Sequence, residues 1–72
     1  MISVQVTYRV YEERTKRGMS TRDLEKLSGV SKTHINAIEN NKTHPTVYTL
    51  LLLAAAMHVA PQRLFRYEVS DI

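Results

Sequence analysis

Residues 20–41 constrain the fold most, because they contain two helix start signals with a helix stop signal between them. Ser20 and Ser31 are each suited to cap a helix N-terminus, since a serine hydroxyl accepts a hydrogen bond from an otherwise unpaired backbone N–H group. Gly29 predicts the end of the first helix, because glycine adopts the left-handed conformation of the C′ position at the least cost. The segment therefore predicts two short helices joined by a tight turn, the second over residues 32–40.

The second of these helices has an apolar side and an outward side. Ile35 and Ile38 lie three residues apart and predict the buried side. The outward positions are then those of Lys32, Thr33, Asn36 and Ala37. Such a helix-turn-helix can offer its second helix to the major groove of DNA, although an ordinary corner between two helices has the same pattern.

The net charge of +3 is unevenly distributed along the chain. Residues 1–44 contain eight Lys or Arg and five Asp or Glu, which gives +3, whereas residues 45–72 contain two of each. The excess positive charge therefore belongs to the part with the two capped helices, as expected of a surface that faces a polyanion. A solvated basic face without a partner would have the same charge.

Length and composition exclude several classes of protein. The 72 residues make one small domain, residues 1–72, and a chain of this size buries only about 60% of its unfolded surface. The absence of cysteine excludes disulfides and thiolate metal sites, and the three histidines lack the spacing of metal ligands. No nucleophile–base pair or phosphate-binding glycine loop is present, so we expect no enzyme activity, cofactor, metal or small-molecule ligand.

The longest apolar run covers residues 50–57 and is far shorter than the roughly 20 residues that span a bilayer. It predicts a buried helix, and we expect no membrane partner. The chain also lacks a signal peptide, which points to the cytoplasm.

The two ends of the chain have the alternation of β-strands. Residues 1–7 alternate β-branched and polar side chains, and residues 67–72 alternate more weakly. The two ends are candidates to pair, either within one chain or across a dimer, because a single strand is not stable alone. A first helix is expected over about residues 6–17, with Val10 inward, and Gly18 ends it.

Two further helices are expected after the helix-turn-helix. The fourth covers residues 47–57, and its core positions are Val47, Leu50, Leu51, Ala54 and Met57. The fifth begins at Pro61, whose missing N–H costs nothing in a first helical turn, and places Leu64 and Phe65 in the core. The expected fold class is therefore all-α with five helices. Whether a short terminal strand pair is present as well stays open at this point.

Several stretches of the chain resemble one known family. They are R-G-M-S, L-S-G-V-S-K, I-x-x-I-E-N, H-P-T-V-x-T-L-L-x-L-A-x-A and V-x-x-x-x-L-F, in collinear order within residues 6–65. The chain thereby resembles the Cro/repressor-type helix-turn-helix domains of bacterial and phage regulators, also described as xenobiotic-response-element-like. The resemblance implies a compact five-helix repressor-like domain with its helix-turn-helix at residues 21–40.

The resemblance also implies which residues contact double-stranded DNA. The third helix would enter the major groove, and its base-contacting positions fall on Lys32, Thr33, Asn36 and Ala37. Ser31 and the amides at the start of this helix suit a phosphate. Further phosphate contacts fall on Thr21, which is shorter than the glutamine common in the family, and on the loop residues Asn40, Lys42 and Thr43.

An ion pair between the first and third helices is implied as well, and it falls on Arg14 and Glu39. The chain departs from the family pattern at Glu13, Glu25, Asn41 and His58. The last two replace glycines and are among the residues that best tolerate positive φ. The two glutamates replace smaller or apolar residues, and they can turn outward to Lys26 or Arg22.

The fourth helix lacks the polar outer face expected of a surface helix. Positions 52 and 55 are commonly lysine in the family, whereas here Tyr48, Leu52 and Ala55 form an apolar stripe. We expect a two-fold homodimer through this stripe and the end of the chain, and the alternative is that a terminal segment covers the stripe within one chain. A homodimer would place two recognition helices about 34 Å apart on a near-palindromic operator.

The function expected from these features is that of a sequence-specific transcriptional regulator, a small repressor that occupies an operator. The alternative is a protein-interaction module on the same fold that binds and titrates another regulator. Only the regulator predicts tight, salt-sensitive and sequence-dependent DNA binding.

Overall fold

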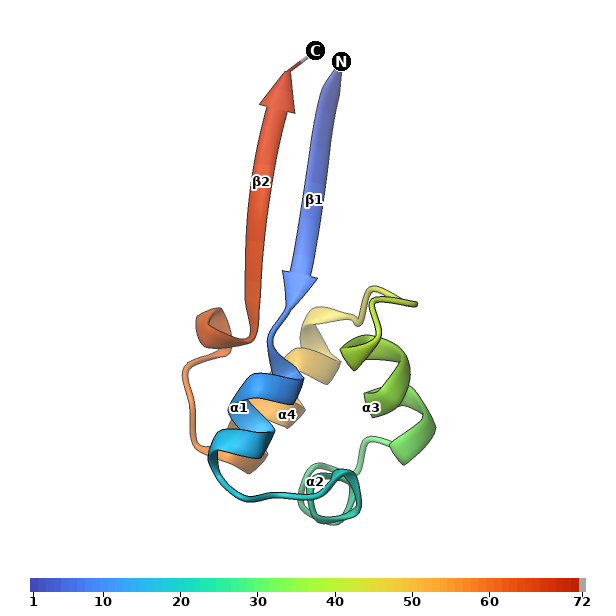
Figure 1. Ribbon diagram of the computed structural model, residues 1–72, viewed down its shortest axis with the longest axis vertical. Helices are drawn as coiled ribbons and strands as arrows, with labels where there is room; N and C mark the ends of the chain where they lie inside the picture. The colour runs from blue at the N-terminus through green and yellow to red at the C-terminus, as the bar shows by residue number, and fades with distance from the viewer. Residues whose placement is uncertain (72) are drawn as a thin grey trace.

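The computed structural model describes residues 1–71, which form a small helical body and a two-stranded sheet that projects from it (Figure 1). The elements in chain order are β1 (Ile2–Tyr8), α1 (Val10–Lys16), α2 (Thr21–Ser28), α3 (Lys32–Glu39), α4 (Val47–Met57), the 3-10 turn η1 (Pro61–Leu64) and β2 (Phe65–Asp71). The molecule measures 42 × 21 × 19 Å, and the strands run along its longest axis.

The expected all-α class with five helices is wrong, because residues 1–71 form four α-helices and a two-stranded antiparallel sheet. The fifth helix is reduced to η1, and Phe65 begins a strand. Pro61 does stand in a first helical turn, but the residues after Leu64 pair with β1, and this long-range pairing overrides the local helix signal. The first helix also starts later than expected, at Val10, because the preceding residues belong to β1.

The terminal sheet, formed by β1 and β2, joins the two ends of the chain. Its antiparallel register pairs Ile2 with Asp71 at the tip and Tyr8 with Phe65 at the base. The tip lies far from the helices (Figure 1), and there the amino group of Met1 is 3.1 Å from the carboxylate of Asp71. The two ends therefore pair within one chain, which is one of the two arrangements that the sequence left open.

The hydrophobic core lies inside the helical body. The four α-helices and η1 each supply at least one side chain with no exposed surface, and these are Val10, Leu24, Ile35, Ile38, Leu53 and Leu64. Helix α4 faces this core with Leu53, Ala54 and Met57, whereas Val47 and Leu51, which were expected in the core, are exposed. Positions 50, 53, 54 and 57 share one side at helical spacing, and this rotation leaves positions 47 and 51 outside.

Candidate nucleic-acid interface

Helix α3 turns one face to the core and the other to the surface. Its N-cap Ser31 accepts a hydrogen bond from the backbone N–H of His34 at 3.1 Å. Ile35 and Ile38 are both 0% exposed, which fixes the rotation of the helix about its axis. The surface positions that result are Lys32, Thr33 and Asn36, which are exposed, and Ala37, which is half-buried.

Hydrogen bonds hold the turn before α3 in one geometry. Gly29 ends α2 with φ of 78°, a left-handed backbone conformation that residues other than glycine rarely adopt. The hydroxyl of Ser28 donates to the carbonyl oxygen of Leu24 at 2.6 Å and accepts from the N–H of Val30 at 3.1 Å. Val30 is buried, so the chain re-enters the core before α3 begins.

Glu25 has a position that the sequence did not predict. Instead of turning outward to Lys26 or Arg22, its carboxylate accepts a hydrogen bond from the backbone N–H of Lys32 at 2.9 Å. The unpaired N–H groups and the dipole at a helix N-terminus favour such a negative charge. The first amide of α3 is therefore already bonded, and a carboxylate lies at the helix end that was expected to receive a phosphate.

An ion pair between Arg14 and Glu39 joins α1 to the end of α3. Arg14 donates from Nε and Nη2 to the two carboxylate oxygens of Glu39, at 2.8 and 2.9 Å, and from Nη1 to the carbonyl oxygen of Met19 at 2.9 Å. The two side chains are only 10% and 8% exposed. The hydrogen bond with Glu39 raises the pKa of Arg14 above its already high ordinary value. Arg14 therefore stays charged in the folded protein, and its hydrogen bonds to Glu39 fix α3 from the core side.

The loop after α3 leaves the C-terminal end of that helix and leads to α4 (Figure 1). The backbone N–H of Lys42 donates to the carbonyl oxygen of Ala37 at 2.9 Å, and the side chain of Asn40 donates to the carbonyl oxygen of Asn36 at 2.8 Å. Asn41 accommodates the turn with φ of 56°. Lys42 and Asn40 are exposed at the surface end of this loop.

The far end of the same loop is attached to β1. The hydroxyl of Tyr8 forms a hydrogen bond of 2.8 Å with Nδ1 of His44, and the two rings meet edge to face. Burial raises the pKa of Tyr8, so its hydroxyl stays protonated. Because the loop is held at both ends, Lys42 and the half-buried Thr43 have a fixed position relative to α3.

The structure thus places most predicted DNA contacts on one continuous segment. Four of them lie on the outer side of α3 and three on the loop that follows it, and Ser31 caps the helix. Thr21 stands apart in sequence as the first residue of α2, where it is half-buried.

Glu13 is a second carboxylate whose surroundings the sequence did not predict. It is almost fully buried and accepts a hydrogen bond from Nη1 of Arg17 at 2.8 Å, with Lys16 at 3.6 Å and Arg63 at 3.8 Å. Burial alone would raise the pKa of Glu13, but the hydrogen bond from Arg17 and the three positive charges outweigh it and lower the pKa. Nε of Arg17 also donates to the carbonyl oxygen of Met57 at 3.0 Å, so this cluster ties α1 to the ends of α4 and η1.

Residues 1–71 contain neither a cluster of metal-ligating side chains nor a helix that could span a membrane. The structure has no group of three or more His, Cys, Asp or Glu side chains in this range that could hold a metal ion. The helices in the same range are all too short or too polar to cross a membrane.

The predicted stripe on α4 is only partly at the surface. Tyr48 is 71% exposed and Ala55 is exposed, whereas Leu52 is half-buried and packs against the core. The terminal segments pair with each other and leave Tyr48 uncovered.

A capped α2, a glycine turn and a third helix with a solvent-facing polar side define a helix-turn-helix domain. The helix-turn-helix family model matches residues 10–69 of the chain. The chain belongs to this family, of the Cro type, and it is a DNA-binding protein of transcription regulation. Members of such a family are regulators rather than enzymes.

Solved structures of similar fold include two controller proteins. The restriction-modification controller protein C.AhdI from Aeromonas hydrophila superposes with a TM-score of 0.73 at 29% identity, over 76% of this chain and 83% of that chain. The controller protein C.Esp1396I gives a TM-score of 0.67 at 29% identity, over 71% of this chain and 65% of that chain. A protein from Bacteroides fragilis gives a TM-score of 0.78 over 86% of this chain and 100% of that chain, but at 22% identity it shows the fold alone. No curated protein sequence matches this chain.

Proposed function

We propose that this protein is a sequence-specific transcriptional repressor that occupies an operator by placing α3 in the major groove of double-stranded DNA. The rotation of α3 is the observation that carries this proposal. Because Ile35 and Ile38 are fully buried, the polar side chains of the helix face the solvent together. The major groove of B-DNA admits an α-helix, and base edges there distinguish all four base pairs.

The exposed side chains of α3 have the chemistry of base recognition. Asn36 can bind adenine with two hydrogen bonds, at N6 and N7, and Lys32 can donate to O6 and N7 of guanine or to a phosphate. Thr33 and Ala37 offer methyl groups to the methyl group of thymine. Phosphate contacts position a protein without specifying a sequence. We assign them to the residues around this face, which are Thr21, Ser31, Asn40, Lys42 and Thr43.

We further propose that the protein binds a near-palindromic operator as a homodimer, with Tyr48, Leu52 and Ala55 in the interface. Tyr48 is exposed together with Val47 and Leu51 on the same side of α4, and this supports the assembly, because a contiguous exposed apolar patch usually marks a contact surface. The similarity to two restriction-modification controller proteins supports a regulatory role.

Selection of binding sites from a pool of random DNA duplexes tests this function. We expect the selected site to be bound at least about a thousandfold more tightly than random duplex. Fluorescence anisotropy titrations at about 50 and 200 mM salt should show affinity falling steeply as salt increases, because phosphate contacts release counterions. Binding that is weak, independent of sequence or insensitive to salt would favour the protein-interaction module instead.

A further inference from the structure

The terminal sheet has one apolar face, and most of that face is in water. Side chains alternate along a strand, and the register pairs Val4 with Val69 and Val6 with Tyr67, so these four side chains lie on the same side. Val6 packs against the core at the base of the sheet. Val4, Tyr67 and Val69 are each more than half exposed. An antiparallel sheet normally packs its apolar face on the core, whereas residues 1–71 supply no covering layer for most of this face.

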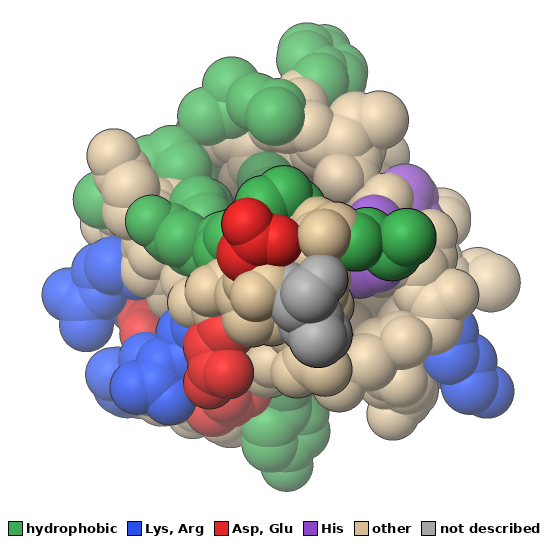
Figure 2. Space-filling model, turned by 90° about the horizontal axis from the view of Figure 1, so that it is seen from above, with side chains coloured by type: hydrophobic (Ala, Val, Ile, Leu, Met, Phe, Trp, Pro, Cys, Tyr) green, Lys and Arg blue, Asp and Glu red, His purple; other side chains and the backbone are tan. Residues whose placement is uncertain are grey.

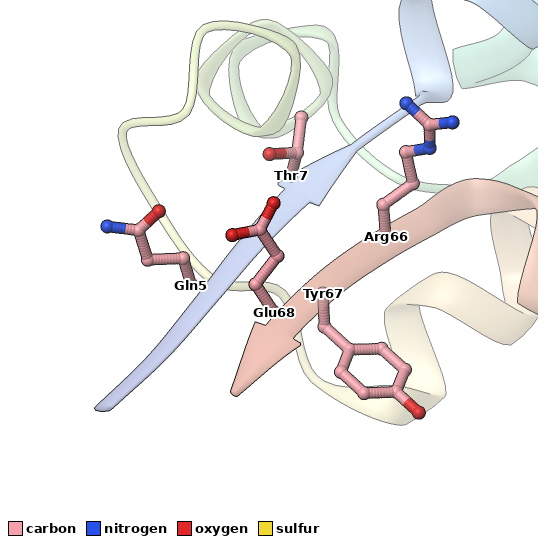
Figure 3. A pocket seen from close by; sticks show the side chains of 5 residues that line it. All are labelled: Gln5, Thr7, Arg66, Tyr67 and Glu68. Atoms are coloured by element: carbon pink, nitrogen blue, oxygen red, sulfur yellow. The ribbon is translucent and has the colours of Figure 1, made fainter. Parts of the chain in front are cut away.

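The opposite face of the sheet is polar. Gln5 pairs with Glu68 and Thr7 pairs with Arg66, and these four side chains point to one side while Tyr67 points to the other (Figure 3). The residues line a shallow hollow of about 380 Å³. The sheet is therefore amphipathic over positions 4–7 and 66–69, and only one of its faces there is suited to water.

The exposed side of α4 is apolar as well. The helix contains no charged residue, and Val47, Tyr48 and Leu51 are exposed on the side away from the buried Leu53. A helix that is apolar all round is normally buried on both sides. Seen from the tip of the sheet, hydrophobic side chains gather mainly on one side of the molecule, and most Lys and Arg side chains lie elsewhere (Figure 2).

The size and charge of this surface fit a second copy of the same chain. Seven large apolar side chains of the terminal sheet and α4 are between 46% and 72% exposed. A standard protein interface buries about 800 Å² on each partner, and a surface with this many exposed apolar side chains is suited to one. The surface is almost free of charge, and the carboxylate of Asp71 at its edge is paired with the amino group of Met1. Self-association about a two-fold axis therefore brings no unpaired like charges together.

We propose that the apolar face of the terminal sheet, continued by the exposed side of α4, is the docking surface for a second copy of this chain, so that the sheet is a dimerisation arm. The surface contains none of the residues assigned to DNA contacts, and both α3 helices of the pair stay free. The inference rests on the proposed function in one respect, since a near-palindromic operator requires a two-fold pair.

A matched pair of variants tests the arm in the absence of DNA. Val4→Lys places a charge on the apolar face, and Gln5→Lys places the same charge one position later on the polar face. Sedimentation equilibrium at micromolar protein should show a dimer for the wild type and for Gln5→Lys. For Val4→Lys we expect a dissociation constant at least about tenfold higher, because a charge replaces a buried interface side chain.

A second variant tests the dimerisation arm if circular dichroism shows that Val4→Lys is unfolded. Val69→Thr keeps the side-chain shape and the preference for strands, and it should still weaken the dimer measurably. A wild type that is monomeric at micromolar protein overturns the proposal. The proposal is also overturned if Val4→Lys and Val69→Thr have the same dimer dissociation constant as Gln5→Lys. This holds even if Tyr48→Lys dissociates the dimer, because the interface would then involve α4 without the sheet. Sequence-specific DNA binding is measured separately, so failure of the arm and failure of the proposed function are distinguishable.

Discussion

Individual charged side chains inside the helical body decide how firmly α3 is held. Arg14 and Glu39 form two hydrogen bonds with each other while almost fully buried, so each compensates the other for lost hydration. We expect Glu39→Gln to lower the free energy of unfolding by roughly 3–5 kcal/mol, because it leaves the Arg14 charge buried without a counterion. Urea denaturation monitored by circular dichroism measures this loss.

The matched control replaces both partners. Arg14→Met combined with Glu39→Leu removes both charges, and it should be much less destabilising than Glu39→Gln alone. A melting temperature of Glu39→Gln equal to that of the wild type would show that the pair contributes nothing to stability.

Glu13 gives a prediction for acid pH. Its pKa is lowered in the folded protein, so it binds a proton less readily when folded than when unfolded. Its stabilising contribution is therefore fully present above the ordinary value of 4.5, and it is lost as the pH falls through the lower folded-state pKa. We expect Glu13→Gln to show a smaller loss of unfolding free energy between pH 7 and pH 3 than the wild type.

Glu12→Gln is the control for this experiment, because the side chain of Glu12 is half exposed and its nearest cation, Arg9, is 3.9 Å away. The acid dependence of Glu12→Gln should follow that of the wild type. If Glu13→Gln loses as much stability at low pH as Glu12→Gln does, another group controls acid unfolding.

The sequence predicted some of these residue positions and missed others for a physical reason. The spacing of Ile35 and Ile38 predicted the solvent-facing side of α3, because one helix turn determines it. Glu25 was missed because its bond to the N–H of Lys32 crosses a turn, and its direction depends on how two helices meet. The ion pairs of Glu13 had a local sequence signal, because Lys16 and Arg17 follow it at i+3 and i+4. Its burial had none, because that depends on α4 and η1 as well.

At the scale of the helix-turn-helix, base contacts and phosphate contacts should respond differently to mutation. Asn36→Ala should lose about 1–3 kcal/mol of binding free energy on the selected operator and little on random duplex. Lys42→Ala should weaken binding to both and reduce the salt slope by about one, because a phosphate contact is independent of sequence. Anisotropy titrations on the two duplexes measure both effects. Equal losses for Asn36→Ala on operator and random duplex would contradict its assignment to a base.

The carboxylate at the start of α3 should weaken DNA binding in the wild type. Glu25→Gln retains an oxygen that can accept from the N–H of Lys32 but removes the negative charge. We expect tighter binding to operator and random duplex alike, with the largest gain at low salt, since screening weakens charge repulsion. Glu68→Gln on the terminal sheet removes the same charge far from α3 and is the control. An unchanged affinity for Glu25→Gln would show that no phosphate approaches this helix end.

The helices and strands, like the residues, divide into those predictable from local sequence and those that depend on the tertiary structure. Both helices of the helix-turn-helix were predictable, because their start and stop signals are local. Ser20 and Ser31 bond to backbone N–H groups three residues further on, and Gly29 ends α2 by its own conformation. Strand β2 was predictable only in part, because Pro61 is compatible with a helix start, the strand alternation was weak and noted only from residue 67, and the partner strand is distant in the sequence. That partner is β1, at the other end of the chain, so only the tertiary structure decides between a helix and β2.

For the whole molecule, dimerisation and operator binding should be coupled. Tyr48→Lys places a charge on the exposed side of α4 without touching the core, whereas Leu52 is half-buried and a charge there would disturb the fold. We expect Tyr48→Lys to sediment as a monomer at micromolar concentration and to lose affinity for the full operator. Its affinity for an isolated half-site should equal that of the wild type, because α3 is unchanged. A Tyr48→Lys variant that stays dimeric and binds its operator normally would place the interface elsewhere.

The terminal sheet also determines the order in which the molecule is completed. It pairs Ile2 with Asp71, so its closure spans nearly the whole chain, whereas the helices form from neighbouring residues. Long-range pairing is slow because the entropy of closing a long loop is lost before any contact compensates for it. A chain leaving the ribosome can therefore assemble its helical body before β2 has emerged, and β1 stays without its partner until then. If the terminal sheet is the dimerisation arm, a chain whose β2 has not yet been synthesised lacks this arm. Dimerisation through the sheet therefore follows the synthesis of β2.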